Sequence, residues 1–486
     1  MAILVAPRSP TTAFGLFQGS ALILLLLVAG GLIGGLPVSW AAAIVIGSLA
    51  LAIALARLEW ALAVLIFSVP FGALRPVELG AIRATGTEVA ALGVFLAWVL
   101  RGVLARRFEV RGSVVLGAFA VFAATVTFST VQATSLSLGL KELLKWGEFL
   151  VVFLAVASLA PRRATPWLVG SLLVAATLEA VLGWAQFLLR LGPPGFVVSG
   201  LFLRAYGTFG QPNPYAGFLG FALPVAAALT LYRQPLSSPW WARYAPWFAL
   251  VLGSAMLMSF SRGAWLAASI GIAVLLALSS ARGLALVLVG ALVGALLLFL
   301  GGLNLLPATI AARLTAFTNL LAVVDVRQVV VTAENWSLVE RMVNWQTAWA
   351  MYEANPWFGI GLGNFGPRYS EFVPITGWPN LTGHAHNYYL TLLGETGVVG
   401  LGGYLLFLVT AFGVAIGAVR RTLSTGTAAG GGRLAHGLAV GILAALVALT
   451  VHNGFDSLYV QGMTTLLGAY LGLAVALTGE EQAAAS

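Results

Sequence analysis

Two of the four histidines of the chain stand close together, at His384 and His386. His386 is followed by Asn387 at the start of an apolar run. An imidazole has an unperturbed pKa near neutrality, so His386 is suited to accept a proton from a substrate hydroxyl. A histidine at a helix start also serves as a cap or an interfacial anchor, and this pattern by itself leaves that structural role open.

A metal site is the second chemistry that the histidine pair suggests. On a helix the i,i+2 spacing directs the two rings apart, so a shared ion requires a turn at this point. Glu395 follows in the same run, either as a second carboxylate of the site or as the partner of an arginine. The chain has no cysteine, which excludes thiolate ligands, disulfides and iron–sulfur clusters. We therefore expect no metal and no cofactor, with His384 as a neighbour of the working histidine.

Three arginines are candidates for binding an anion. Arg204 precedes Asn213, which has the position of an N-cap before a proline-started membrane helix, and a helix N-terminus beside an arginine favours negative charge. Arg262 lies between two short apolar runs. Arg341 lies in the first turns of the helix predicted for the long outer loop, four residues before Trp345. Each of them alone is explained equally well by snorkelling or an ion pair. Together they suit a diphosphate, whose oxygens guanidinium groups bind in a bidentate way.

The elements that must position these side chains are membrane helices. The chain is 60% hydrophobic and 8% charged, with a mean hydropathy of +0.97. Continuous apolar runs of about 20 residues recur along it, which is typical of transmembrane helices and excludes the alternating pattern of a barrel. The sequence predicts an all-α, polytopic helical bundle with about 12 to 14 transmembrane segments. The first run, Phe14 to Gly35, is interpreted as a retained helix because it lacks a clear cleavage site.

The arginine distribution predicts the orientation of the bundle. The positive-inside rule is best satisfied with both termini in the cytoplasm. Scattered basic residues with this bias indicate membrane topology, not nucleic-acid binding. The expected divisions are N-terminal transmembrane helices at 1–303, a large helical extracytoplasmic loop at 304–386 and C-terminal transmembrane helices at 387–486. All candidate site residues then fall on the outer face.

The long outer loop contains a predicted helix. Ser337 and Glu340 have the spacing of a capping box, and Asn355-Pro356 ends the helix. The helix is expected to place an apolar face against the membrane or the bundle, formed by Met342, Trp345, Trp349 and Tyr352. The glycine-rich stretch Phe358–Gly366 has no strand before it, so we interpret it as a tight turn and not as a nucleotide-binding loop.

His386-Asn387 followed by Gly397, Gly400 and Gly402 is similar to the signature of the O-antigen ligase and O-antigen polymerase superfamily. Features in the same order extend the resemblance over about 204–402: Arg204 before Gly207-Thr208-Phe209 and Pro212-Asn213, Ser261-Arg262-Gly263, Arg341 before Trp345, and Asn355-Pro356 before Gly359-Ile360-Gly361. The resemblance implies a metal-independent, GT-C-like glycosyltransferase of the inner membrane that acts on the periplasmic side. It implies His386 as the catalytic histidine, with Arg204, Arg262 and Arg341 engaging the diphosphate of an undecaprenyl-diphosphate-linked glycan donor. Asn387, Asn213, His384 and Glu395 are expected beside the substrate.

The function that fits these residues is transfer of a glycan from the lipid diphosphate to a sugar hydroxyl of lipid A-core, as an O-antigen ligase does. A polymerase of O-antigen or exopolysaccharide shares the same residues and stays open as an alternative. The alternative of another class is a transporter or flippase of lipid-linked sugars, which would place ionisable groups near the bilayer midplane. A lipid-binding structural protein is the third alternative, in which the His386 cluster would be expendable.

Overall fold

The computed structural model of the chain describes residues 38–79, 82–108, 110, 111, 113–198, 202–234, 238–302, 305, 324–332, 335–379, 383–424 and 430–479. In the N-terminal half these form α2 (Val38–Ala56), α3 (Leu58–Phe71), β1 (Val77–Leu79), β2 (Ile82–Ala84), α4 (Gly86–Leu104), α5 (Ser113–Ser129), η1 (Thr130–Gln132), α6 (Leu136–Ala157), α7 (Pro161–Leu189), η2 (Pro194–Phe196), β3 (Val197–Val198), β4 (Phe202–Leu203) and α8 (Pro212–Tyr232). The rest forms α9 (Trp240–Arg243), α10 (Ala245–Met258), α11 (Arg262–Ser279), α12 (Ala281–Gly302), η3 (Val326–Gln328), α14 (Trp336–Ala354), α15 (Tyr369–Phe372), α16 (Tyr388–Ser424), α17 (Gly430–His452) and α18 (Met463–Gly479).

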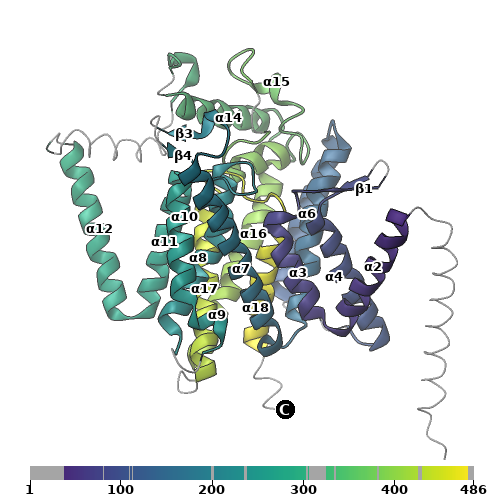
Figure 1. Cartoon of the computed structure of the whole chain (residues 1–486). Helices are drawn as coiled ribbons and strands as arrows, with labels where there is room; N and C mark the ends of the chain where they lie inside the picture. The colour runs from purple at the N-terminus through teal and green to yellow at the C-terminus, as the bar shows by residue number, and fades with distance from the viewer. Residues whose placement is uncertain are drawn as a thin grey trace, which may run out of the picture.

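The all-α prediction is confirmed, because helices make up the bundle in Figure 1 and the strands of the described residues form two short antiparallel hairpins. Among the described residues, 8 helices are long and apolar enough to cross a membrane. Others are shorter; α3 and α10 have 14 residues each. At 1.5 Å per residue such a helix is about 21 Å long, less than the ~30 Å hydrocarbon core. The predicted first helix, Phe14 to Gly35, lies outside the described residues.

The C-terminal helices pack against partners far away in the sequence. α18 packs on α6, α17 on α8 and α11, and α16 on α5 and α17. A cluster of buried aromatic rings joins α5, α6 and α16, including Phe122, Trp146, Phe149, Tyr404 and Phe407. The turns that precede α16 and α18 are therefore enclosed by helices of the N-terminal half. By contrast, α12 lies at the edge of the bundle beside α11 (Figure 1). In its most apolar stretch of 18 residues, 6% of the residues are buried.

The long loop forms a cap in which α14 and α15 lie over one end of the bundle (Figure 1). The predicted helix end at Asn355 is confirmed, but the predicted capping box is wrong: α14 begins at Trp336 with Asn335 as N-cap and no side-chain capping bond. The predicted apolar face is also corrected. Met342 is buried as expected, whereas Trp349 is 49% exposed, and the buried side of α14 includes Val339 and Met351. Trp345 and Tyr352 are half-buried, so Trp349 is the member of the predicted face that points outward.

The glycines after α14 are required by close backbone contact. Gly359, Gly361 and Gly363 all have positive φ, which confirms a tight turn. Gly397 breaks the helical geometry inside α16 with φ 64° and ψ −169°. At this break the N–H of Val398 donates to the carbonyl of Pro356 at 2.9 Å. A Cβ on Gly397 would lie 2.3 Å from the backbone of Trp357, so this position excludes larger residues and locks the cap to α16.

Candidate active site

The loop that carries His386 is held in a strained turn. His386 has φ 52°, in the left-handed region that few non-glycine residues adopt. Its N–H donates to Nδ1 of His384 at 3.1 Å. The next residue, Asn387, caps α16 by accepting the N–H of Leu390 at its Oδ1, 3.1 Å away. The turn therefore places the His386 ring immediately before the first turn of a rigid helix.

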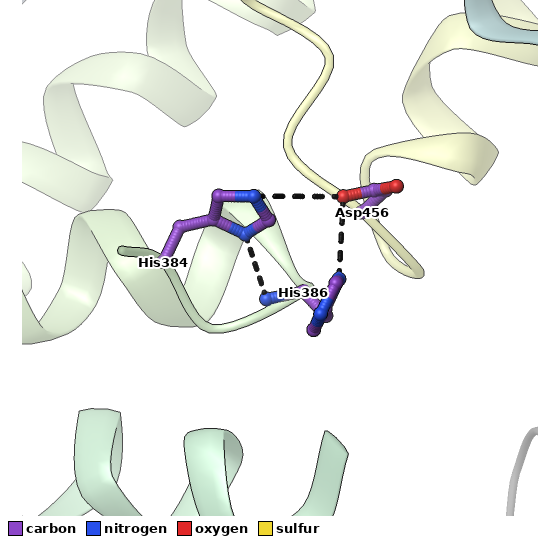
Figure 2. Close-up of side chains that lie close together, drawn as sticks. All are labelled: His384, His386 and Asp456. Atoms are coloured by element: carbon purple, nitrogen blue, oxygen red, sulfur yellow. Dashed lines mark hydrogen bonds and ion pairs between the residues drawn. The ribbon is translucent and has the colours of Figure 1, made fainter. Parts of the chain in front are cut away.

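Backbone contacts bring this loop against the turn after α17. The N–H of Tyr388 donates to the carbonyls of Asn453 (2.7 Å) and Asp456 (3.1 Å). Asp456 is buried, with 3% of its surface exposed. Its Oδ1 lies 3.5 Å from Nδ1 of His386 and 3.9 Å from Nε2 of His384. Figure 2 shows both imidazoles directed at this one carboxylate.

The contacts also assign the proton positions on both rings. Nδ1 of His384 accepts a backbone N–H, so its proton is on Nε2, facing Asp456. Nδ1 of His386 faces the carboxylate and carries the proton there, which leaves Nε2 of His386 as a base. Burial by itself raises the pKa of Asp456, but the hydrogen bond from His386 and the nearby imidazoles outweigh it and hold this pKa well below its usual range. Asp456 is thus a stable anion that orients His386 and can stabilise its imidazolium.

Lowering the pH from about 6.5 to about 4 is expected to destabilise the fold through His384. Burial lowers its folded-state pKa from 6.5 to about 4, partly offset by Asp456. Within this window the unfolded chain binds the proton and the folded one does not, so stability present above pH 6.5 is lost on acidification, on the order of 2–3 kcal/mol. His384→Gln should flatten the decline of the melting temperature with falling pH, measured by tryptophan fluorescence. An unchanged slope would contradict this assignment.

The same three side chains also satisfy a first requirement of a metal site. One ligand atom from each of His384, His386 and Asp456 lies within 4.8 Å of the others. Tetrahedral zinc needs ligand atoms roughly 3.4 Å apart, a spacing that follows from bonds of about 2.1 Å. The turn that a shared ion requires is present, since His386 has a positive φ in place of helical geometry. A small closure of the cluster would let it hold a divalent ion, in competition with proton transfer by His386.

Arg204 is fixed beside this cluster by the segment that follows β4. Its Nε donates to the carbonyl of Ser259 at 2.8 Å, and Nη2 donates to Oδ1 of Asn213 at 3.2 Å. Burial, and next the charge of Arg262, lower the pKa of Arg204 to about 10, while Asp456 acts in the opposite direction. Arg204 therefore stays charged at neutral pH in a buried environment, which favours a bound anion.

Arg341 reaches the same region from α14. Burial and the charge of Arg262 lower its pKa, and Asp456 and Glu340 act in the opposite direction. Arg204 and Arg341 thus both interact electrostatically with Arg262 and Asp456, which brings the two arginines into the neighbourhood of the His386–Asp456 pair. Nε of Arg341 is buried and has no hydrogen-bond partner among the described residues. A buried donor without a partner costs about 1–3 kcal/mol, a penalty that an anionic ligand would relieve.

Two side chains of α7 form hydrogen bonds with the backbone of the loop that carries Arg204. Oε1 of Gln186 accepts the N–H groups of Tyr206 (3.0 Å) and Gly207 (2.8 Å), and its Nε2 donates to the carbonyl of Gly207 at 2.9 Å. Glu179, which precedes Gln186 in α7, accepts the N–H of Thr208 at 3.1 Å. Two buried polar side chains of a membrane helix are therefore used to set the loop geometry, which orients Arg204.

The remaining candidates have different surroundings. Asn213 contacts Arg204, but it lies inside the first turn of α8, whose N-cap is Gln211, so its predicted N-cap position is wrong. The Asn387 side chain caps α16. Both carboxylate oxygens of Glu395 accept backbone N–H groups of the glycine turn, from Gly363 and Phe365, each at 2.9 Å. A direct substrate role for these residues stays a prediction. Asp456 has no motif of its own, and its only signal in the sequence is its place on the same predicted face.

Fold and site together define a multi-pass membrane protein with a His–Asp pair among three arginines at one end of a helical bundle. Residues 247–405 match the family model described as O-antigen ligase. This match supports the O-antigen ligase superfamily, whose members are glycosyltransferase-like enzymes, over that part of the chain. The matched range contains Arg262, Arg341 and His386, while Arg204 and Asp456 lie outside it.

No curated protein matches the chain at a significant level. Among solved structures, the chain is similar to a chain from a structure titled "Structural coordination of polymerization and crosslinking by a peptidoglycan synthase complex". The two are 19% identical over 76% of this chain and 98% of the other, with a TM-score of 0.41. A likeness at this level carries no argument about the function of this chain.

Proposed function

We propose that the protein transfers a glycan from undecaprenyl diphosphate to a sugar hydroxyl of lipid A-core, as an O-antigen ligase. The observation that carries the proposal is the pairing of His386 with Asp456 at 3.5 Å beside Arg204, Arg262 and Arg341. A base next to an anion-binding cluster suits a reaction in which a hydroxyl attacks and a diphosphate leaves. The family match supports a glycan-transferring enzyme.

In the proposed reaction the acceptor hydroxyl oxygen bonds to the anomeric carbon as the bond from that carbon to the diphosphate oxygen breaks. The hydroxyl proton moves to Nε2 of His386, and Asp456 stabilises the imidazolium. The electron pair of the broken bond leaves with the diphosphate, whose charge the three arginines offset. Displacement in one step inverts the anomeric configuration and needs neither nucleotide nor metal.

The arginine distribution supports an inner-membrane protein with both termini in the cytoplasm and this site on the periplasmic face. A polymerase that extends O-antigen or exopolysaccharide on the carrier lipid is the second candidate, because the matched family accommodates both activities. The two reactions share the donor and differ in the acceptor. The gathering of the charged candidates at one end of the bundle favours a one-sided active site over a transport path.

Transfer by purified protein is expected to proceed in EDTA at the rate measured without it, because His386 and the arginines perform the proton transfer and the charge compensation. The assay combines undecaprenyl-diphosphate-linked glycan with lipid A-core and separates products by size. One addition to lipid A-core identifies a ligase, and ladders on the carrier lipid identify a polymerase. Loss of transfer in EDTA that returns with added divalent ion would instead assign His384, His386 and Asp456 to metal binding.

A further inference from the structure

A second concave site lies in the cap, on the exposed side of α14. It is a cavity of about 380 Å³. Trp345, Gln346, Trp349 and Glu353 line one wall from successive turns of α14. The other walls include Asp325 and Arg327 at η3, Phe372 and Pro374 at the end of α15 and just beyond it, and Leu390 of α16. This volume falls in the range of pockets that bind small molecules, about 300–1,000 Å³.

The lining combines flat aromatic surfaces with hydrogen-bonding groups. Trp349 is 49% exposed, and its indole is held by a hydrogen bond from Nε1 to Oε1 of Glu353 at 2.8 Å. Nε2 of Gln346 donates to the carbonyl of Val324 at 2.7 Å, which commits the donor side of the amide and leaves Oε1 as an acceptor. Carboxylates and amides bind hydroxyl groups, and the negative face of an indole attracts the C–H face of a sugar ring.

The charges around the cavity exclude the diphosphate as its ligand. Asp325 and Glu353 outnumber the single cation Arg327 in the lining, so a phosphate group would meet net repulsion. Phosphate-binding character is concentrated instead at Arg204 and Arg341. Most of the lining comes from α14 and from the segments at α15 and η3. Helices α14 and α15 lie over one end of the bundle (Figure 1), whereas lipid chains would lie along its sides.

The position of the cavity connects it to the reaction centre. Met342, which lines it, follows Arg341 in α14, and Leu390 lies in the first turn of α16, directly after the His386 loop. The two helices that carry or follow the candidate active-site residues thus form part of the cavity wall. A glycan whose reacting end lies at His386 has its neighbouring sugars within reach of this wall.

We propose that this cavity is a saccharide subsite in which Trp349 stacks on a sugar ring of one of the two glycan substrates, a proposal that rests on the proposed transferase function. Trp349→Ala is expected to raise KM for that substrate about tenfold, with kcat changed less than about threefold, and Trp349→Phe to retain most of the affinity. Trp357→Ala is the matched control, since Trp357 is 67% exposed in the same cap and does not line the cavity.

The two possible sources of the sugar are separated by changing one substrate at a time. If the donor glycan occupies the cavity, the KM effect falls on the donor and disappears with a donor that carries a single sugar. If the acceptor occupies it, the effect falls on lipid A-core alone. Equal KM values for wild type and Trp349→Ala with both substrates would overturn the subsite.

Binding without turnover separates the subsite from the transferase assignment. His386→Ala protein is applied to an array of short neutral and acidic oligosaccharides that lack the lipid diphosphate, with and without Trp349→Ala. Binding that requires Trp349 supports the subsite even where no transfer is found, in which case only the transferase assignment fails. Binding that persists in Trp349→Ala, or no binding at all, counts against the subsite, whatever the transfer assay gives.

Discussion

Replacing His386 with alanine is expected to lower the rate of glycan transfer by about 10²- to 10⁴-fold, the usual contribution of a positioned general base. The substitution removes the Nε2 atom that accepts the hydroxyl proton in the proposed mechanism. KM for the lipid-linked donor should change little, because in that mechanism the arginines bind the diphosphate and the imidazole does not. The measurement is initial rate against donor concentration in detergent or nanodiscs.

Asp456→Asn tests the pairing and not the base itself. The amide keeps the shape of the side chain but cannot stabilise an imidazolium, and loss of such an orienting partner lowers the rate by up to about 10⁴-fold. His436→Gln is the matched control, because His436 is a buried histidine that contacts Thr422 Oγ1 at 3.1 Å and lies outside the His–Asp cluster. Wild-type rates in both His386→Ala and Asp456→Asn would refute the general-base mechanism.

Arg341→Gln is expected to reduce kcat/KM for the donor by about 10²- to 10³-fold, as does loss of one group that stabilises developing negative charge. Arg341 is buried with an unpartnered Nε, so the anion is its natural partner. Arg341→Lys should recover only part of the activity, because an ammonium keeps the charge but lacks the planar fork for two phosphate oxygens. Undecaprenyl diphosphate added as an inhibitor should bind more weakly to both variants.

The matched control for Arg341 is Arg368→Gln. Arg368 also lies in the cap, but its guanidinium is paired with Glu371 at 2.6 Å. Its loss should leave donor kinetics unchanged, since an exposed ion pair contributes at most about 1 kcal/mol to stability. Equal inhibition constants for wild type and both Arg341 variants would remove this residue from the diphosphate site. Melting temperatures measured alongside separate this result from misfolding of the cap.

Much of the fold follows from local sequence patterns. An apolar run in a bilayer forms a helix, because the surrounding lipid offers no hydrogen-bond partner to the backbone. The apolar runs in the described part of the chain accordingly form helices. The end of α14 at Asn355 was equally predictable, since a following proline disfavours helical geometry. Its start was not. The helix begins at Trp336, so Ser337 lies inside its first turn and not at the N-cap position that the capping pattern requires.

The candidate site divides in the same way. Histidine and arginine types in a chain with 8% charged residues were enough to single out His386, Arg204 and Arg341, because burying a charge is costly unless it has a use. The types alone did not assign Asn387 to a helix cap or Glu395 to the amides of the glycine turn. Either side chain has several possible partners, and packing selects one of them.

By itself, the sequence determined that this protein is an all-α membrane bundle, with a histidine and several arginines as candidates for chemistry. Only the tertiary structure decided that Asp456 pairs with His386, that both imidazoles face one carboxylate, and that Arg204 and Arg341 both interact electrostatically with Arg262 and Asp456. The physical reason is the distance along the chain over which each influence acts. Hydropathy and turn preferences act over a few residues, whereas the site depends on the docking of Tyr388 onto Asn453 and Asp456, which side-chain packing across the whole bundle sets.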